Sequence, residues 1–424
     1  MKKGLCSLMS QLLGASRAWV DKRHFRQVRL LRSLLLVVVL CVCFVGWSLP
    51  NLSMLSVMTA AGNTTEVKPV RGPRIYNDSA NGRKRIYKHD ALDGSRRLAE
   101  AKARKETRVL KTAESITYTD EQGVIYTLEE NAQTYTVTGY TIGYTDELSG
   151  ITIASVVNGL PVTAIGESAF LYCTTLTSII LPNSIVSISE FAFQNCDGLA
   201  SVTLSNSLKT IGAYAFSYCN ALTSITIPNS VTEIGSYAFW NSRALTSIII
   251  PSSVTSIGYN VFSDCSGLAS IVVEEGNTEY DSRNNCNAII STATNDLIAG
   301  CKNTVIPNSV VSIGSYAFEG CYGLSSVSIH RNIKSIGIGV FKGCTGLASI
   351  VVESGNTIFD SRDNCNAIIN TATNSLVAGC KNTVIPNSVT SIDFDAFAGN
   401  TGLTSIVIPS SVTKIDGNAF YGCI

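Results

Sequence analysis

Cysteine is the residue type in this chain that could support the widest range of chemistry. Thiolates bind soft metal ions, act as nucleophiles and form disulfides, and the 424 residues include 14 cysteines. Seven of them stand three residues after a phenylalanine, at Cys173, Cys196, Cys219, Cys265, Cys321, Cys344 and Cys423. Such a ladder places thiols along a line rather than at tetrahedral corners, which disfavours zinc and favours small buried core residues.

Two further cysteine pairs lie at the ends of two nearly identical segments. Cys286 and Cys301 flank NAIISTATNDLIAG, and Cys365 and Cys380 flank NAIINTATNSLVAG. Each segment has the pattern of a β-hairpin, with Ile289-Ile290 facing Leu297-Ile298 in the first, so both cysteines would lie at its base. In an exported protein each pair can be a disulfide or two free buried thiols, and free thiols are the first expectation.

Signals for catalysis or for a cofactor are absent from the sequence. The three histidines are His24, His89 and His330, and there is no nucleophile beside a histidine, phosphate-binding glycine loop or metal-ligand cluster. Turns rich in Asp and Asn at residues 281–287 and 360–366 could hold a cation, but they lack the spacing of a calcium loop. We therefore expect a protein without enzymatic activity, cofactor or metal site.

Charge is distributed unevenly along the chain. Residues 1–111 carry 22 Lys and Arg against 7 Asp and Glu, whereas residues 112–424 carry 10 against 24, although the whole chain has a formal charge of +1. An acidic body repels phosphate, so the sequence disfavours nucleic acid as a partner.

The N-terminal region has the pattern of an export or membrane segment. Residues 33–49 contain no charge and follow a basic leader at residues 1–32, which the positive-inside rule places in the cytoplasm. Small residues at Thr59-Ala60-Ala61 favour a cleaved signal peptide within residues 33–61, whereas the long leader favours a signal anchor forming a transmembrane helix. Residues 62–111 are predominantly basic with few large apolar side chains, which predicts a disordered spacer outside the membrane.

A strict repeat governs the rest of the chain and must position the cysteines. The phenylalanine of an Ala-Phe or Val-Phe pair recurs every 23 residues at Phe170, Phe193, Phe216, Phe239 and Phe262, and again at Phe318, Phe341, Phe397 and Phe420. The two longer gaps are copies of one another, with enlargements near residues 274–303 and 353–382. A fixed short period of this kind predicts a solenoid in which each coil contacts only its neighbours.

One unit, residues 244–265, indicates how a coil is built. Alternation in Ser247-Ile248-Ile249-Ile250 predicts a strand, which ends at Pro251 because proline offers no N–H to a ladder. The stretch from Val254 to Ile257 predicts a short second strand, and the Val-Phe pair predicts a short helical turn. The apolar side chains of one coil cannot offset the entropy lost in ordering it, so coils must stack.

The recurring pattern LTSIxIPxSVTSIGxxAFxxC resembles the BspA-type class of leucine-rich repeats over residues 161–424. This resemblance implies a right-handed, β-rich leucine-rich-repeat solenoid and, for exported members, a cell-surface protein associated with adhesion. Residues 112–160 resemble the β-hairpin that precedes and caps such arrays. The chain ends at the close of a unit without a polar capping sequence, so we expect either truncation or cover by another chain.

The outward strand positions and an aromatic edge are the candidate binding surfaces. Serine fills one outward column, and Ile, Thr, Val or Ser fills the next, which predicts a small, flat, uncharged concave face suited to weak multivalent contacts. Aromatic residues flank the phenylalanine column of the early coils, at Tyr172, Phe191, Tyr214, Tyr218, Tyr237 and Trp240. They would form a ligand-binding ridge or simply seal the turns by stacking.

These features predict an exported, membrane-tethered scaffold that binds extracellular proteins of a host matrix or a neighbouring cell. Residues 33–49 would contact the membrane, and the repeats would lie at the cell surface or be secreted. The alternative is a structural spacer or a carbohydrate-associated envelope protein without a tight protein partner. An intracellular interaction module requires that residues 33–49 do not direct export.

Overall fold

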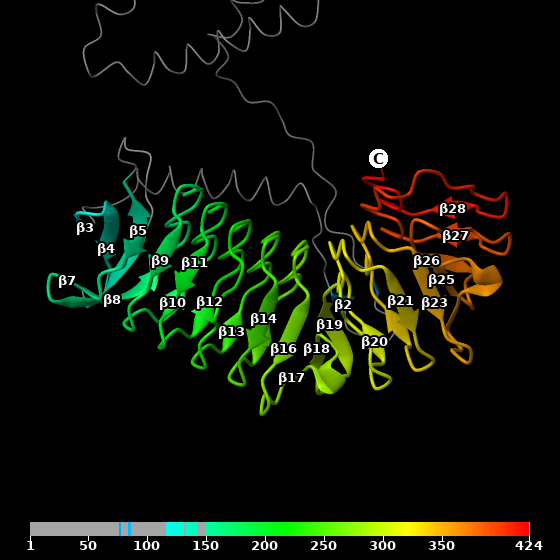
Figure 1. Cartoon of the computed structure of the whole chain (residues 1–424), viewed down its shortest axis with the longest axis horizontal. Helices are drawn as coiled ribbons and strands as arrows, with labels where there is room; N and C mark the ends of the chain where they lie inside the picture. The colour runs from blue at the N-terminus through cyan, green and yellow to red at the C-terminus, as the bar shows by residue number, and fades with distance from the viewer. Residues whose placement is uncertain (1–75, 78–83, 86–115, 131–132, 142–149, 424) are drawn as a thin grey trace, which may run out of the picture. The chain divides into compact units, whose positions relative to one another are not determined.

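The repeat region folds as a β-solenoid, a stack of parallel coils (Figure 1). The computed structural model describes residues 76–77, 84–85, 116–130, 133–141 and 150–423, so the predicted leader and membrane segment at residues 1–61 lie outside it. Among the described residues, no helix combines the length and apolar character needed to cross a membrane. Within the predicted spacer, β1 (Tyr76–Asn77) pairs antiparallel with β2 (Lys84–Arg85).

Most coils contribute to two parallel ladders, because two extended stretches recur at the same spacing. Residues 224–227 and 405–408 form no strand, and the first ladder is divided among separate sheets. The first ladder contains β9 (Ser178–Ile180), β11 (Ser201–Thr203), β14 (Ser247–Ile250), β16 (Ser270–Val273), β21 (Ser326–Ile329) and β23 (Ser349–Val352). The second contains β10 (Ser187–Ile188), β12 (Thr210–Ile211), β13 (Glu233–Ile234), β15 (Ser256–Ile257), β20 (Ser312–Ile313), β22 (Ser335–Ile336), β27 (Ser391–Ile392) and β28 (Lys414–Ile415). Equivalent residues pair, as Ile248 does with Ile271, which confirms the two predicted strands per coil.

A small antiparallel sheet begins the stack. The strands β3 (Thr117–Thr119), β4 (Val124–Leu128) and β5 (Tyr135–Tyr140) pair in sequence order, and β5 then pairs parallel with β8 (Leu160–Ile165). Two short strands complete this end: β6 (Ile151–Thr152) joins β9, and β7 (Val156–Val157) joins β8. Its tyrosines Tyr126 and Tyr135 are buried, so the antiparallel sheet covers the first coil.

The side of each coil that carries the phenylalanine consists of turns, not the short helical turn predicted from the sequence. The reason is that the backbone N–H of Phe193 donates to the carbonyl of Ala215 in the next coil, at 2.8 Å, rather than within its own segment. The rings stack behind these turns, with centroids 5.2 Å apart for Phe170 and Phe193. The only helices among the described residues are the 3₁₀ turns η2 (Arg283–Asn285) and η3 (Arg362–Asn364).

The two enlargements insert hairpins into the second ladder. The first comprises β17 (Tyr280–Asp281), β18 (Ala288–Ser291) and β19 (Asp296–Gly300), and the second comprises β24 (Phe359–Asp360), β25 (Ala367–Asn370) and β26 (Ser375–Gly379). β19 pairs parallel with β20, as a normal coil strand would. Ile290 pairs with Leu297 but Ile289 pairs with Ala299, because a bulge between Ile289 and Ile290 shifts the predicted register.

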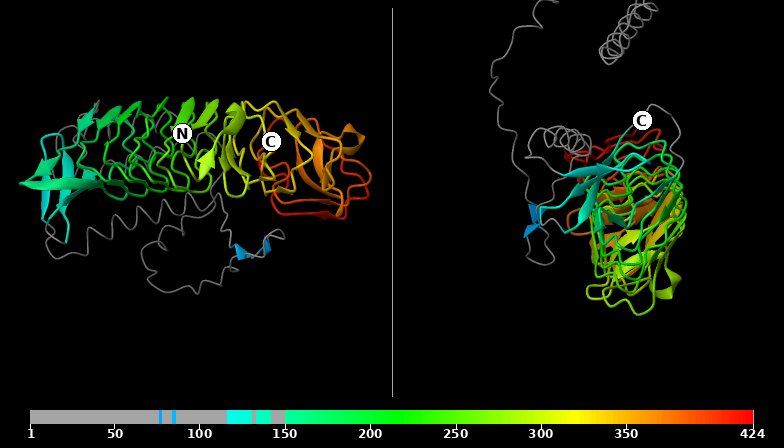
Figure 2. Two further views of the ribbon diagram at one scale, coloured as in Figure 1. Left: turned by 90° about the horizontal axis from the view of Figure 1, so that it is seen from below. Right: turned by 90° about the vertical axis from the view of Figure 1, so that its left-hand side faces the viewer.

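On the turn side, the coils that flank each enlargement remain direct neighbours. The N–H of Asp264 donates to the carbonyl of Glu319 at 3.0 Å, and that of Gly343 donates to Ala398 at 2.9 Å. Figure 2 shows the strands of the early coils along one side of the stack and the turns along the opposite side. Added strands therefore widen the stack on one side only, which turns the following coils toward the turn side.

Gly300 and Gly379 allow the enlargements to fit against the phenylalanine column. In an ordinary coil the N–H of the phenylalanine donates to the carbonyl of the alanine that precedes the next phenylalanine, as Phe193 does to Ala215. In the enlargements a glycine makes this bond instead, and the N–H of Gly300 donates to the carbonyl of Ala317 at 2.8 Å. A Cβ atom at Gly300 would overlap the ring of Phe318, and one at Gly379 would overlap that of Phe397.

Replacing either glycine by alanine should therefore destabilise the stack. We expect Gly300→Ala to lower the free energy of unfolding by about 1–3 kcal/mol, the usual cost of overpacking a core. Gly139→Ala is the matched control, because its Cβ would meet Ile125 at an ordinary 3.7 Å. Urea denaturation of the full chain measures the free energy of unfolding of both variants. Equal stability of the two would contradict the proposed overlap with the ring of Phe318.

Candidate functional site

The cysteine column is a hydrogen-bonded part of the core. Four of its buried thiols donate to the carbonyl of the phenylalanine in the preceding coil. These thiols belong to Cys196, Cys219, Cys265 and Cys344, with Sγ to O distances of 3.1, 3.3, 3.0 and 3.0 Å. A fifth, Cys321, contacts the carbonyl of Gly300 at 3.7 Å, where the enlargement replaces the phenylalanine. Ser242 stands in the same column, and its hydroxyl makes the same bond to Phe216 at 2.7 Å. The predicted core position is confirmed for these buried thiols.

Burial makes these thiols poor nucleophiles. It raises the pKa of the Cys265 thiol to about 12, and it raises the pKa of Cys196 well above the usual value. A protonated thiol is neither a metal ligand nor a nucleophile, but it retains the proton that the carbonyl accepts.

The hairpin cysteines are free thiols in the structure. Cys301 donates to the carbonyl of Asn287 at 3.4 Å, whereas Cys286 has a separate carbonyl contact of 3.9 Å two residues along the chain. Cys365 and Cys380 repeat this arrangement in the second enlargement. Each pair flanks its hairpin as predicted, with a different carbonyl for each thiol in place of a disulfide.

The Asp-rich turns considered for a cation hold an arginine instead. The carboxylate of Asp281 accepts from Nε of Arg283 at 2.8 Å and from Nη2 at 2.6 Å. A further bond of 2.7 Å joins Arg283 Nη1 to Asn295, across the hairpin. Arg362 and Asp360 make the same ion pair in the second copy, at 2.9 Å. In the first enlargement, Arg283 therefore links β17 to the turn between β18 and β19.

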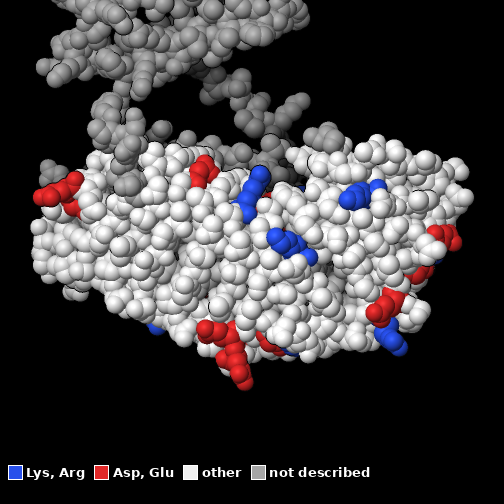
Figure 3. All heavy atoms as spheres, in the orientation of Figure 1, with Lys and Arg blue, Asp and Glu red and all other residues white. Residues whose placement is uncertain are grey.

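Aliphatic side chains protrude from the strand face at equivalent positions of several coils. We call them the aliphatic row: Ile180, Ile249, Val272, Val351 and Val407, with exposed fractions of 48, 54, 43, 50 and 84%. The ladder that pairs Ile249 with Val272 also pairs Ser247 with Ser270, so the serine column runs beside the row. These outward positions are uncharged, as predicted, and few charges mark the face seen in Figure 3.

Half of the predicted aromatic ridge forms a stacked ladder. Phe191 stacks on Tyr214 at 5.1 Å, and Tyr214 on Tyr237 at 4.7 Å. All three have positive φ, between 57° and 60°, a conformation that is costly for bulky residues. Ring stacking offsets this cost, and it leaves Phe191 and Tyr214 buried.

The other three ridge residues are Tyr172, Tyr218 and Trp240, and they are less buried. Tyr218 packs edge-on against Trp240 with ring centroids 4.9 Å apart. The indole N–H of Trp240 donates to the carboxylate of Asp264 at 3.0 Å. Trp240 thereby connects the ridge to a cavity on the turn side.

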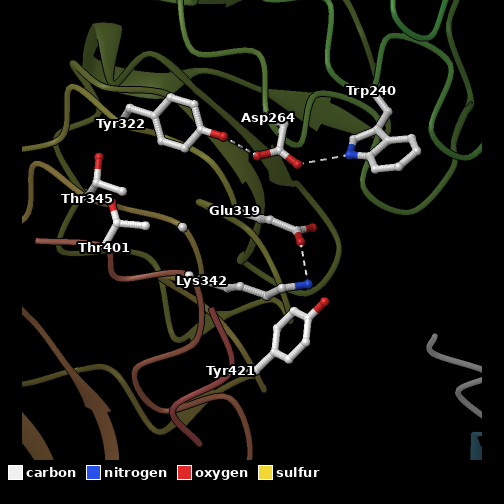
Figure 4. A pocket seen from close by; sticks show the side chains of 10 residues that line it. Trp240, Asp264, Glu319, Tyr322, Lys342, Thr345, Thr401 and Tyr421 are labelled. Atoms are coloured by element: carbon white, nitrogen blue, oxygen red, sulfur yellow. Dashed lines mark hydrogen bonds and ion pairs between the residues drawn. The ribbon is translucent and has the colours of Figure 1, made fainter. Parts of the chain in front are cut away.

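This turn-side cavity has a volume of about 460 Å³. Every residue that lines it stands one to four positions after the phenylalanine of its coil. Figure 4 labels Trp240, Asp264, Glu319, Tyr322, Lys342, Thr345, Thr401 and Tyr421 around it. The cavity lies on the side of the stack opposite the enlargements. Because the added strands widen only the strand side, the turns of successive coils approach one another here.

Three charged side chains are held in fixed positions in the cavity wall. Asp264 accepts from Trp240 and from the hydroxyl of Tyr322, at 3.0 Å in both cases. Buried Glu319 pairs with Lys342 at 2.8 Å. Burial raises the pKa of Glu319 although Lys342 acts to lower it, and burial together with Asp264 raises the pKa of Tyr322 to about 12. The wall therefore presents both signs of charge in fixed positions.

Only Trp240 among these lining residues is predicted from the repeat. The others come together because coils separated by 56 residues in sequence become neighbours on the turn side, as Asp264 and Glu319 do. A signal existed, however: the position two residues after the phenylalanine changes from Tyr218, Asn241 and Asp264 to glycine in the later coils.

The repeat matches a known protein-family model. The model described as a BspA type Leucine rich repeat region matches in six copies, over residues 163–289 and 370–424. Residues 163–289 and 370–424 carry BspA-type leucine-rich repeats. No curated protein matches the chain.

Solved structures of leucine-rich repeat proteins are also similar to this BspA-type array. A leucine rich cell surface protein from Faecalibacterium prausnitzii is 29% identical over 74% of this chain and 94% of its own, with a TM-score of 0.46. A leucine-rich repeat protein from Eubacterium ventriosum is 23% identical over 74% and 96%, with a TM-score of 0.47. One from T. pallidum is 27% identical over 54% and 90%, with a TM-score of 0.39.

The thiol column of the BspA-type coils can be tested by paired substitutions. Cys265→Ala removes the thiol donor from the buried carbonyl of Phe239, which keeps only the backbone N–H of Ser242, so we expect the free energy of unfolding to fall by about 0.5–1.5 kcal/mol. Cys265→Ser keeps a donor, as Ser242 does naturally, and should cost less. Urea denaturation compares the two, and an equal loss would show that the thiol acts through its volume alone.

Proposed function

We propose that this chain is an exported, membrane-tethered repeat scaffold that binds proteins outside the cell through its strand face. The observation that carries the proposal is the aliphatic row, which exposes β-branched side chains at one position of several coils and places Ile249 directly beside Val272. Exposed apolar patches are typical of protein interaction sites. The parallel ladder holds them in place, so little conformational entropy is lost on binding.

The chemistry of the row favours a protein partner and weak, repeated contacts. Valine and isoleucine side chains offer no hydrogen bond to a sugar, but they suit an apolar patch on another protein. The row contains none of the Trp, Tyr and Arg side chains that dominate tight interfaces. Useful affinity would then require several coils to engage together, as in multivalent binding.

An extracellular location is the second part of the proposal. The uncharged segment at residues 33–49 and its basic flank support an extracellular location for the repeats. Protease treatment of intact cells checks this topology. We expect digestion of the repeats without lysis, and protection until the membrane is opened would contradict export.

Substitution within the aliphatic row tests the binding surface. The triple variant Ile249→Ser, Val272→Ser, Val351→Ser should weaken saturable binding of the full chain to immobilised extracellular-matrix proteins by at least about tenfold, or about 1.4 kcal/mol. Its thermal midpoint should change little, because these side chains are already exposed. Surface plasmon resonance measures the affinity.

The matched control is Val305→Ser with Val384→Ser, two valines that are 72 and 71% exposed but lie outside the row. Equal losses in the control and the triple variant would contradict the proposal. Envelope polysaccharides are tested in parallel on the same surface. Retention by polysaccharide without any saturable protein binding would favour the alternative, a carbohydrate-associated envelope protein.

A further inference from the structure

The turn-side cavity exists because one column of the repeat loses its side chains. The position two residues after the phenylalanine carries Asn241 and Asp264 in neighbouring early coils, but Gly343 and Gly399 in later ones. All four have φ between 59° and 71°, so the backbone is the same and only the side chain is missing. The volume of about 460 Å³ falls in the range of roughly 300–1,000 Å³ found for small-molecule sites.

Aromatic rings and hydroxyl groups surround this space (Figure 4). Trp240, Tyr322 and Tyr421 supply the rings, and Tyr421 is 60% exposed at the rim. Thr345 and Thr401 line another part of the wall. Among the described residues, neither threonine hydroxyl has a hydrogen-bond partner, so both are available to a ligand.

The carboxylate groups in the wall disfavour acidic ligands. Asp264 is held by two neutral donors, so an anion entering the cavity meets repulsion from its carboxylate. Lys342 is paired with Glu319, so its charge is already matched and does not offset this repulsion. A neutral ligand with many hydroxyl groups avoids this cost, because each hydroxyl both donates and accepts.

We propose that the turn-side cavity binds a short segment of a neutral saccharide. Its hydroxyl groups would donate to Asp264 and accept from Lys342 and the two threonines, while the apolar faces of its rings pack on the aromatic side chains. This site lies on the turn side and the aliphatic row on the strand face. Failure of one proposal therefore leaves the other standing.

Trp240 provides a direct reporter of the site. The chain has three tryptophans, Trp19, Trp47 and Trp240, so the full chain carrying Trp19→Phe and Trp47→Phe has a single indole, in the cavity wall. Neutral probes are maltotetraose, cellotetraose and chitotetraose, which differ in linkage and in the N-acetyl group. Charged probes of equal length are deacetylated chitotetraose and tetragalacturonate. We expect saturable change of Trp240 fluorescence with at least one neutral probe, and affinity at least about tenfold weaker for tetragalacturonate.

Substitutions at the rim separate binding from folding. Tyr421→Ala, and separately Thr345→Val with Thr401→Val, should each weaken the neutral probe by about tenfold while the thermal midpoint stays unchanged. Tyr259→Ala is the matched control, since this tyrosine is 63% exposed and does not line the cavity. It should leave the affinity unchanged.

Three outcomes would overturn the proposal. The first is no fluorescence change with any neutral probe up to roughly 10 mM, well above the dissociation constants of weak specific sites. The second is tighter binding of a charged probe than of its neutral counterpart, which would make the cavity a site for ionic groups. The third is an equal loss of affinity in Tyr421→Ala and Tyr259→Ala, which would place binding elsewhere on the surface.

Discussion

The repeat region depends on one constraint, that most of its backbone hydrogen bonds run between coils instead of within them. Phe193 donates to Ala215, and Phe216 donates to Ala238, so each coil supplies the acceptors for the coil before it. A coil of another length would lose these partners. The constraint also brings backbones so close that a Cβ at Gly258 would overlap the backbone of the preceding coil at Ser236. Side chains at equivalent positions consequently stack on copies of themselves, which produces the phenylalanine and thiol columns.

The enlargements show how this constraint accommodates extra chain. On the ladder side each hairpin adds strands and continues the pairing, with β19 taking a normal coil position beside β20. On the turn side nothing is added, and Asp264 bonds directly to Glu319 across the insertion. The stack can therefore absorb an insertion only by widening on one side. The turn-side cavity follows from this asymmetry together with the loss of side chains at Gly343 and Gly399.

The sequence period predicts the features that every coil shares. It does not predict a residue whose hydrogen-bond partner lies in another coil. Two strands per coil and buried columns at Phe216 and Cys219 follow from the spacing, because every copy has the same neighbours. The turn around Phe193 was wrongly expected to be helical, since a local pattern cannot reveal that its N–H bonds to the next coil. The role of the thiols as donors depends likewise on a carbonyl 26 residues earlier in the chain.

A perfect repeat offers the same small surface many times, which suits binding through area but leaves no room for a pocket. A pocket needs an interruption of that regularity. In this chain the later coils provide one by replacing side chains with glycine, and buried polar groups lie beside these glycines. Gly339 leaves the space through which Tyr316 reaches Asp395, two coils away, with a hydrogen bond of 3.0 Å. Lys342 lies 5.4 Å from the ring of the same tyrosine while it pairs with Glu319. Burying charge is costly unless every group has a partner, so these residues can be retained only where several coils converge. The same convergence supplies the fixed donors and acceptors that a ligand of definite shape requires.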